Sequence, residues 1–429
     1  MTGVAVARPQ SDAAPAGWRG GWRQGLSYGA LGLPLAFVAL PLYVVLPNHY
    51  ASTFGVPLAT LGALLLGARL LDAVADPWIG RLVDGWFRHS TQRVLVAAAL
   101  AAVLLAIGFR ALFFPPVESG SALLWWCGAV LALTYLSYSV VSVIHQAWGA
   151  RLGGDEGQRA RVVSWREGLA LAGVLVASVL PSLAGLGVAS LTFAVLLALA
   201  SALLCFAPRP ALEAAGAAVP SMLLPLYTPA FRRLLLVYLV NGVASAVPAT
   251  LVLFFIRDRL QASAYEPLFL ASYFAAGALS MPFWVRLVGR FGLAPTWLGA
   301  MGLAVISFAW AAMLGAGDIM AFTIVCIASG VALGADLSLP GALLAGVIQR
   351  AGHGGRLEGA YFGWWNFATK LNLALAAGVA LPLLAAFGYA PGNQDGEGLR
   401  ALTIAYCLLP CALKLGAAAL LYTRWIRPR

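Results

Sequence analysis

Three charged residues in the segment 67–77 have types and a spacing that could do chemistry. Asp72 follows Arg69 by three positions and Asp76 follows it by seven, so an α-helix places all three on one face. Two carboxylates one helical turn apart repel each other. In an apolar environment a cation bound between them, or a proton on one of them, relieves that repulsion. The spacing therefore predicts a Na⁺ or H⁺ site, while a salt-bridge network around Arg69 is the structural alternative.

The elements that must position these residues are long and apolar. Of the 429 residues, 61% are of the types AVILMFWYC and only 10% are charged, against ~25% charged residues in soluble domains. A helix needs ~20 mostly apolar residues to cross a bilayer. Twelve runs are long enough: 27–47, 57–79, 94–114, 122–148, 163–186, 188–207, 234–256, 267–285, 295–315, 319–348, 360–388 and 401–423. This composition excludes a water-soluble fold and predicts an all-α membrane protein with twelve transmembrane helices.

The longest internal connection divides the twelve runs six and six. The segment 77–83 at the end of the second run parallels 282–288 at the end of the eighth, and such a parallel repeat is typical of the major facilitator architecture. We therefore predict two six-helix bundles in that architecture. The expected divisions are a disordered cytoplasmic tail (1–26), an N-terminal bundle (27–207), a cytoplasmic linker (208–233), a C-terminal bundle (234–423) and a cytoplasmic tail (424–429).

Arginines predict the orientation of the chain. Nineteen of them lie in the two tails and in alternate loops, and four lie in the opposite loops, so both termini should be cytoplasmic. We expect a multi-pass protein of a bacterial inner membrane that is a monomer and has no obligate protein partner. The net charge of +11 reflects this topology, because no basic stripe with interleaved aromatics indicates nucleic acid.

Buried charges in other runs are further candidates, because a charge at the bilayer centre costs ~2.5–3.5 kcal/mol. They are Arg166, Glu167, Asp336, Lys370 and Lys414. Arg166 either points at a substrate or pairs with Glu167 or Asp155. Lys370 is interpreted as a cationic switch that pairs with Asp76 or Asp72 when no metal is bound, and Asp336 has Lys370 or Lys414 as its expected partner.

Two further features concern conformation and proton linkage. Gly80, Asp84 and Arg88 form a Gly-x-x-x-Asp-x-x-x-Arg arrangement at the predicted cytoplasmic end of the second run, which we interpret with Arg69 as a gate or structural clasp. His145 is either a proton-linked group or, by preference, a core histidine. The histidines lack metal-ligand spacing and no nucleophile or phosphate-loop motif occurs, so no enzyme is predicted, and no cofactor beyond the coupling ion.

The segment 68–80 resembles the second helix of the glycoside-pentoside-hexuronide:cation symporters, through its Arg-x-x-Asp-x-x-x-Asp-Pro-x-x-Gly pattern. The resemblance implies that Asp72 and Asp76 form most of the Na⁺ or H⁺ site. The segment 142–173 looks like the family's fourth helix and the start of its fifth, which puts Arg166 on a sugar-binding arginine. The segment 358–370 is similar to the eleventh helix, which puts Lys370 between the cation and sugar sites.

The sequence also departs from this family. A first-helix Lys-Asp pair is replaced by Leu33 and Pro34, and an acidic residue of the fourth helix by Ser142. The resemblance therefore implies retained cation coupling without the family's sugar-binding carboxylate, and Asp336 is a candidate to supply the missing negative charge.

These features together predict a secondary active transporter. We expect cation-coupled symport of a sugar, glycoside or related small solute by alternating access. The expected substrate contacts are Arg166, Asn366, Lys370, Asp336, Trp365 and Tyr361. The alternatives are a lipid or lysolipid transporter and a proton-driven exporter of a non-sugar solute.

Overall fold

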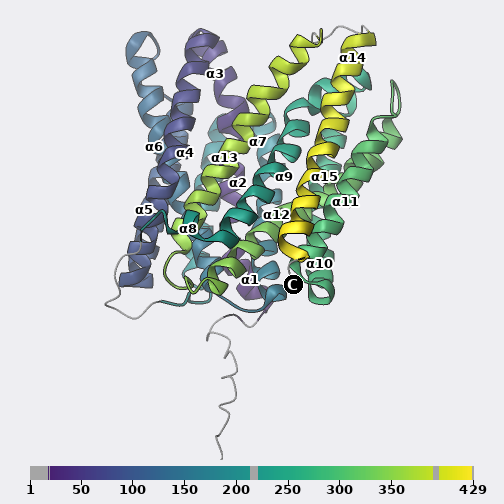
Figure 1. The fold of residues 1–429 in the computed structure, drawn as a ribbon. Coiled ribbons are helices and arrows are strands. Elements are labelled where there is room, and N and C mark those ends of the chain that lie inside the picture. Colours follow the sequence, from purple (N-terminus) through teal and green to yellow (C-terminus); the bar gives the residue numbers. More distant parts are fainter. Residues whose placement is uncertain (1–17, 19, 213–220, 390–395, 428–429) are drawn as a thin grey trace, which may run out of the picture.

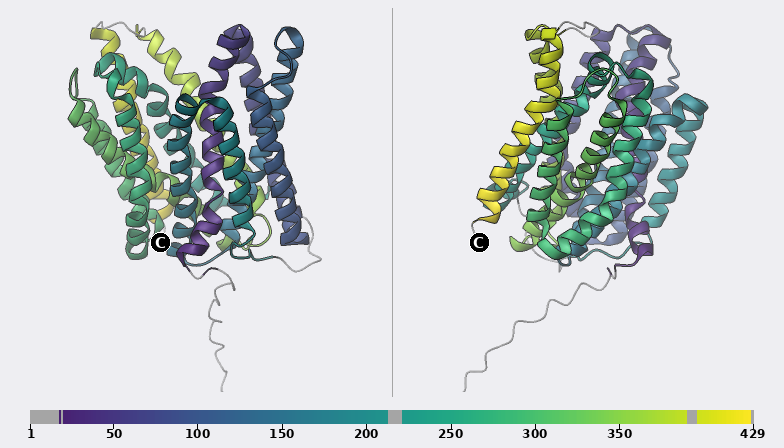
Figure 2. Two further views of the ribbon diagram at one scale, coloured as in Figure 1. Left: turned by 180° about the vertical axis from the view of Figure 1, so that it is seen from behind. Right: turned by 90° about the vertical axis from the view of Figure 1, so that its right-hand side faces the viewer.

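The computed structural model describes residues 18, 20–212, 221–389 and 396–427. Within these ranges the chain forms long helices that stand side by side in one bundle (Figure 1). Figure 2 shows the same bundle from behind and from the side. No strand occurs in the described residues, as expected of a chain that must satisfy its backbone hydrogen bonds inside a membrane.

The first half of the chain supplies six crossings. The first is the continuous helical segment Trp22–Phe54, and the others are made by four long helices. The elements are α1 (Trp22–Gly29), α2 (Gly32–Leu40), η1 (Pro41–Val45), α3 (Leu46–Phe54), α4 (Leu58–His89), α5 (Thr91–Phe113), α6 (Gly120–Arg151) and α7 (Glu156–Leu204).

Helix α7 makes two of these crossings. Its 49 residues would extend ~74 Å at 1.5 Å per residue, well over the ~30 Å of a bilayer core. Gly185, with φ 81° and ψ 165°, interrupts the helical backbone, and only glycine adopts such a conformation readily. The chain then returns to the end where α7 began, because the carbonyl of Pro208 accepts from the Trp148 indole at 2.9 Å.

The second half supplies the other six crossings. Its elements are α8 (Leu224–Tyr227), α9 (Pro229–Phe254), η2 (Phe255–Arg259), η3 (Ser263–Tyr265), α10 (Glu266–Phe291), α11 (Leu293–Ala311), α12 (Ile319–Arg350), α13 (Glu358–Ala386), α14 (Gly396–Thr403), η4 (Ile404–Leu408), α15 (Leu409–Leu421) and η5 (Tyr422–Ile426). Among the described residues, nine helical segments are long and apolar enough to cross a membrane. Counting α7 twice and adding α4 and α13 gives the predicted twelve.

Both ends of the helical chain lie at one face of the bundle. Helix α1 begins and η5 ends at the lower face in Figure 1, which we call the tail face. Apolar packing joins the halves near this face, because one core cluster combines Ala150, Ala160 and Val163 of the first half with α9–α13 of the second. A separate cluster lies within each half.

The predicted tail and linker boundaries need correction. The first helix begins at Trp22, four residues before the predicted end of the tail at 26. The apolar content of the sequence did not predict the first residues of α1, because this helix is amphipathic. It buries Gly25 and Tyr28 and exposes Trp22. In the linker 208–233, α8 is already helical and α9 begins at Pro229. Residues 1–17, 19, 213–220 and 428–429 lie outside the described part.

Candidate functional site

The predicted cation site lies where the two halves meet. Lys370 on α13 places Nζ 2.7 Å from Oδ2 of Asp72 and 2.7 Å from Oδ2 of Asp76, both on α4. Ser139 on α6 donates to Oδ1 of Asp72 at 2.7 Å and accepts from Lys370 Nζ at 2.9 Å. A side chain of the second half thus bridges two carboxylates of the first.

A glycine lets the two helices approach closely enough for this bridge. A Cβ on Gly363 of α13 would lie 2.5 Å from the backbone oxygen of Asp76, a separation that real Cβ atoms do not show. Lys370 follows Gly363 by seven residues, or ~10 Å along the helix. Lys370 therefore lies about two turns along α13 from this close approach, and its long side chain reaches Asp72 and Asp76.

The charges of this site do not balance. Two carboxylates share one ammonium, which leaves a formal charge of −1 on the three side chains. Asp76 is fully buried, and its Oδ1 has no hydrogen-bond donor among the described residues. Such an orphaned oxygen is unusual in a folded protein, and carboxylate oxygens are ligands that a hard cation prefers. No cluster of three or more His, Cys, Asp or Glu side chains occurs in the described part, so a metal ion here would rely on two carboxylates and neutral oxygens.

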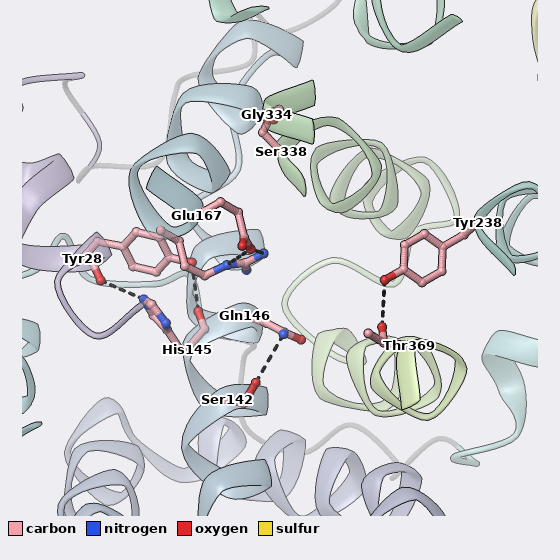
Figure 3. A network of polar contacts seen from close by, with 10 residues as sticks. Tyr28, Ser142, His145, Gln146, Glu167, Tyr238, Gly334, Ser338 and Thr369 are labelled. Carbon is pink, nitrogen blue, oxygen red and sulfur yellow. Dashed lines mark hydrogen bonds and ion pairs between the residues drawn. The ribbon is translucent and has the colours of Figure 1, made fainter. Parts of the chain in front are cut away.

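A second charged pair, on α7, carries the predicted substrate arginine. Arg166 donates through Nε and Nη2 to Oε1 of Glu167 at 2.8 and 2.6 Å. Figure 3 shows Glu167 and Gln146 on one side of this region and Tyr238 with Thr369 on the other. The structure therefore adopts the ion pair that the sequence left open for Arg166.

Aromatic side chains of the second half lie beside these groups. Trp365 of α13 stacks on Tyr238 of α9 with ring centroids 3.7 Å apart and planes at 22°. The Tyr238 hydroxyl is 2.8 Å from Oγ1 of Thr369. Asn366 is also buried. Stacked aromatic rings next to hydroxyl and amide groups match a sugar ring, which has apolar faces and hydroxyl groups at its edge.

Asp84 of the Gly80–Arg88 arrangement joins the two halves at the tail face. Asp84 accepts the backbone N–H groups of Gly359 and Ala360 at 2.7 and 2.8 Å, at the N-terminus of α13, where a helix dipole favours an anion. Arg151 of α6 lies 2.9 Å from Asp84 and 3.0 Å from Glu358. Sequence analysis found Asp84 but not Arg151 or Glu358, because their role depends on which helix ends meet.

A second carboxylate makes the same kind of contact nearby. Glu156, at the start of α7, accepts the backbone N–H of Leu293 at 2.7 Å, at the N-terminus of α11. Arg159 donates to Gln349 at 2.9 Å. Two carboxylates of the first half thus cap two helices of the second half at the tail face, and sequence analysis missed this second cap.

Asp336 lies in a different site from the one predicted for it. Its Oδ2 is 2.6 Å from Nζ of Lys414, and its Oδ1 accepts from Asn241 at 3.2 Å and from Trp297 at 2.8 Å. All four residues belong to the second half, on α9, α11, α12 and α15. Asp336 therefore pairs with Lys414 rather than Lys370, and its carboxylate is already saturated with donors.

Tyr361 also needs correction as a substrate contact. It is fully buried near the tail face, where its hydroxyl lies 2.9 Å from Thr228 Oγ1 and 2.8 Å from Nδ1 of His353. Burial and the neighbouring Arg356 guanidinium lower the pKa of His353, which lies in the loop before α13. The imidazole is therefore neutral at pH 7, and Tyr361 packs the closed face instead of facing a solute.

Arg69 and His145 both make local contacts. The Arg69 guanidinium lies 4.3 Å from the ring centroid of Tyr43, which is a cation–π contact. His145 is buried, with Nε2 2.8 Å from the backbone oxygen of Tyr28. His145 thus ties α6 to α1, as expected of a core histidine.

Comparison with known proteins identifies the family. A model described as MFS/sugar transport protein matches residues 27–426. The chain belongs to this family. Its members are membrane transporters of the major facilitator type, which confirms the predicted architecture and excludes an enzyme.

Curated relatives match over part of their length or at low identity. The inner membrane symporter YicJ of Escherichia coli is 31% identical over 137 residues, which are 30% of this chain and 28% of YicJ. The putative glycoside/cation symporter YagG of E. coli is 31% identical over 36% of this chain and 33% of YagG. The uncharacterized symporter YjmB of Bacillus subtilis is 22% identical over 88% of this chain and 87% of YjmB. The chain thus spans about a third or less of the length of YicJ and YagG in those matches.

Solved structures show the same fold. A bacterial homologue of the iron transporter ferroportin, in its outward-facing state, has a TM-score of 0.70 at 17% identity, over 94% of this chain and all of that one. The transporter FucP in its outward conformation has a TM-score of 0.65 at 11% identity, over 92% of this chain and 98% of FucP. At sequence identities this low, the similarity shows a shared fold and nothing more.

Proposed function

We propose that this transporter is a cation-coupled symporter of a neutral sugar or glycoside, working by alternating access. The observation that carries the proposal is the bridge from Lys370 to Asp72 and Asp76. The three side chains of this bridge carry a net charge of −1, which one Na⁺ or one H⁺ would neutralise. The printed description of YagG as a glycoside/cation symporter agrees with it.

The bridge provides a mechanism for coupling. The Lys370 ammonium lies 2.7 Å from each carboxylate. A cation entering the site competes with the ammonium for the same oxygens and releases it. The freed ammonium can then donate to a substrate hydroxyl, so that solute binding is favoured only after the cation has bound.

Charge pairing nearby favours a neutral solute. The Arg166 guanidinium is neutralised by Glu167 on the same helix, and Lys414 is neutralised by Asp336. With one monovalent cation bound, Asp72, Asp76, Lys370 and the cation carry no net charge together. The site then has no net positive charge to offset a buried anionic solute, and burying an uncompensated charge is unfavourable. Paired Arg166 and Glu167 can still donate to and accept from hydroxyl groups, while Trp365 and Tyr238 offer ring faces.

The contacts at the tail face supply the gate. Asp84 and Glu156 of the first half cap α13 and α11 of the second half. While these caps hold, the halves are joined at the tail face. We take this face to be cytoplasmic and the bilayer to be a bacterial inner membrane, so that breaking the caps opens the solute path to the cytosol.

Uptake by the purified, reconstituted protein tests the proposal. Radiolabelled galactosides, glucosides, pentosides and hexuronides are offered to proteoliposomes carrying an inward Na⁺ gradient, an inward H⁺ gradient or neither. At least one neutral glycoside should accumulate under one of the two gradients. Asp76→Asn and Asp72→Asn should abolish accumulation, because each removes a carboxylate from the cation site.

Glu118→Gln is the matched control, since it removes one carboxylate from an exposed loop. It should transport like the wild type. Gradient-driven accumulation by Asp76→Asn and Asp72→Asn at the wild-type rate would overturn the cation assignment. Accumulation of lysolipid but no glycoside would overturn the substrate class.

A further inference from the structure

We propose that an anionic phospholipid binds in a lateral groove between the two halves at the tail face, with its phosphate held by Arg161 and Arg286. The groove is lined by α1, α7 and α10 and has a volume of about 520 Å³. This site is separate from the bridge of Lys370 to Asp72 and Asp76. It does not depend on the solute that the protein transports.

The walls of the groove are apolar and face outward from the bundle. Trp22 of α1 is 64% exposed and Leu279 of α10 is 80% exposed. Trp165, Leu169 and Val285 complete much of the lining. In a helix bundle that crosses a bilayer, apolar side chains exposed to this extent contact lipid chains. The groove is therefore filled by acyl chains in the membrane.

The charged groups lie at the tail-face end of the same groove. Arg161 is in the second turn of α7, and Arg286 lies five residues before the end of α10 at Phe291. Arg286 follows Leu279 by seven residues, so the two lie ~10 Å apart along the helix axis. Both arginines are exposed. They take the position of a lipid headgroup above the acyl chains.

Both arginines are available to a ligand. Within the described ranges, neither makes a side-chain hydrogen bond or ion pair with another residue, unlike Arg151, Arg159 and Arg166 of the same region. A guanidinium offers a planar pair of donors that matches a phosphate. Basic pockets between transmembrane helices bind anionic headgroups in this way.

A buried hydroxyl in the groove points to a polar ligand as well. Ser164 lines the groove and is 9% exposed, and its Oγ has no hydrogen-bond partner among the described residues. Buried hydroxyls normally have partners. The ester or glycerol oxygens of a phospholipid, which lie just below the phosphate, satisfy such a group. An aliphatic ligand with no polar head would leave the buried Ser164 hydroxyl without a hydrogen-bond partner.

The groove also links the halves, since α1 and α7 belong to the first and α10 to the second. A phosphate held by both arginines therefore bridges the halves on the side where Asp84 and Glu156 cap helices. Bound lipid would stabilise the form with a closed tail face.

Native mass spectrometry of the detergent-purified protein tests the proposal. Phosphatidylglycerol and phosphatidylcholine with the same acyl chains are titrated separately. The wild type should retain one phosphatidylglycerol more tightly than any phosphatidylcholine, and a large excess of inorganic phosphate should not displace it. The double variant R161Q/R286Q should weaken this binding by more than about tenfold, since each basic residue contributes ~1 kcal/mol near an anionic lipid.

Two variants separate the groove from general surface charge. R93Q/R290Q removes two exposed arginines near the same face that do not line the groove, and it should bind like the wild type. Ala278→Trp fills the groove while leaving both arginines, and it should lose the tight lipid. Equal retention of the two lipids, displacement by phosphate, equal weakening by R93Q/R290Q, or tight binding to Ala278→Trp would each overturn the proposal.

Discussion

At the scale of single residues, the Lys370 ammonium lies between the carboxylates of Asp72 and Asp76, where we propose that the coupling cation binds. Its ammonium holds two carboxylates together at 2.7 Å each. Without the lysine, the two carboxylates would repel each other at close range. In the proposed mechanism, Lys370 therefore competes with the cation for these carboxylate oxygens.

Replacing the lysine should therefore tighten cation binding. We expect Lys370→Gln to bind Na⁺, or a proton if the protein is H⁺-coupled, at least about tenfold more tightly, or ~1.4 kcal/mol. The measurement is the cation-induced rise in melting temperature of the purified protein, over a range of Na⁺ concentrations and of pH. Solute accumulation should be lost because the switch is gone. A weaker cation response than that of the wild type would show that the lysine assists the cation rather than competing with it.

The pair of Asp336 and Lys414 should behave differently. Lys414→Gln leaves Asp336 as an unpaired charge within the second half, which typically costs ~3–5 kcal/mol. We expect a clearly lower melting temperature with an unchanged cation response. The double variant Asp336→Leu with Lys414→Met should recover most of the stability, because an apolar pair replaces an ionic one. Loss of the cation response in Lys414→Gln, with the fold retained, would connect this pair to coupling.

At the scale of elements, close backbone contacts between α4 and α13 hold the tail face closed. A Cβ on Gly80 would lie 2.2 Å from the carbonyl oxygen of Gly359, and a Cβ on Gly359 would lie 2.3 Å from that of Gly80. These glycines let Asp84 reach the N-terminus of α13. The proposed gate therefore depends on two residues that carry no side-chain heavy atoms.

A single methyl group at this contact should open the gate. Gly80→Ala forces α4 and α13 apart, and overpacking of this kind costs ~1–3 kcal/mol. That shifts the equilibrium toward the open tail face by ~5- to 150-fold. Hydrogen–deuterium exchange at the start of α13 (358–363) should be faster by a similar factor.

Gly67→Ala is the matched control, since it adds the same methyl group to α4 where no heavy atom lies within 4 Å. Exchange at the start of α13 should match the wild type in this variant. Equal exchange in Gly80→Ala and Gly67→Ala would mean that the Gly80–Gly359 contact does not hold the gate.

At the scale of the whole molecule, the ends of the helical chain and the contacts that join the halves share one face. The arginine-rich segments of the sequence meet there too, including Arg151, Arg159 and Arg161 at the junction of α6 and α7. Positive charge of this kind stays on the cytoplasmic side during insertion.

Reporter fusions should therefore assign the tail face to the cytoplasm. Green fluorescent protein fused after residue 429 should fluoresce, and alkaline phosphatase fused there should be inactive. Alkaline phosphatase fused after Gly317, in the turn between α11 and α12 at the opposite face, should be active. The reverse pattern would invert the topology and with it the proposed direction of uptake.

The sequence by itself determined the number of crossings, the six-and-six division and the Asp72–Asp76 pair. Each of these follows from local properties: runs of ~20 apolar residues cross a bilayer, and positions four apart share a helical face. Helix ends were less well predicted, as at the amphipathic α1, because apolar content alone does not mark them.

The pairing of Lys370 with Asp72 and Asp76 was expected from the sequence, although Lys370 and Asp72 are 298 positions apart. The contact between Asp84 and Gly359, 275 positions apart, was not expected, because no local rule connects them. The structure also decided that Asp336 pairs with Lys414 and not with Lys370. It likewise showed that Tyr361 is buried at the tail face against Thr228 and His353. Helix packing sets these distances through glycine contacts and shape across the whole bundle. The sequence thus identifies the ionisable groups, and the packing decides which of them are in contact.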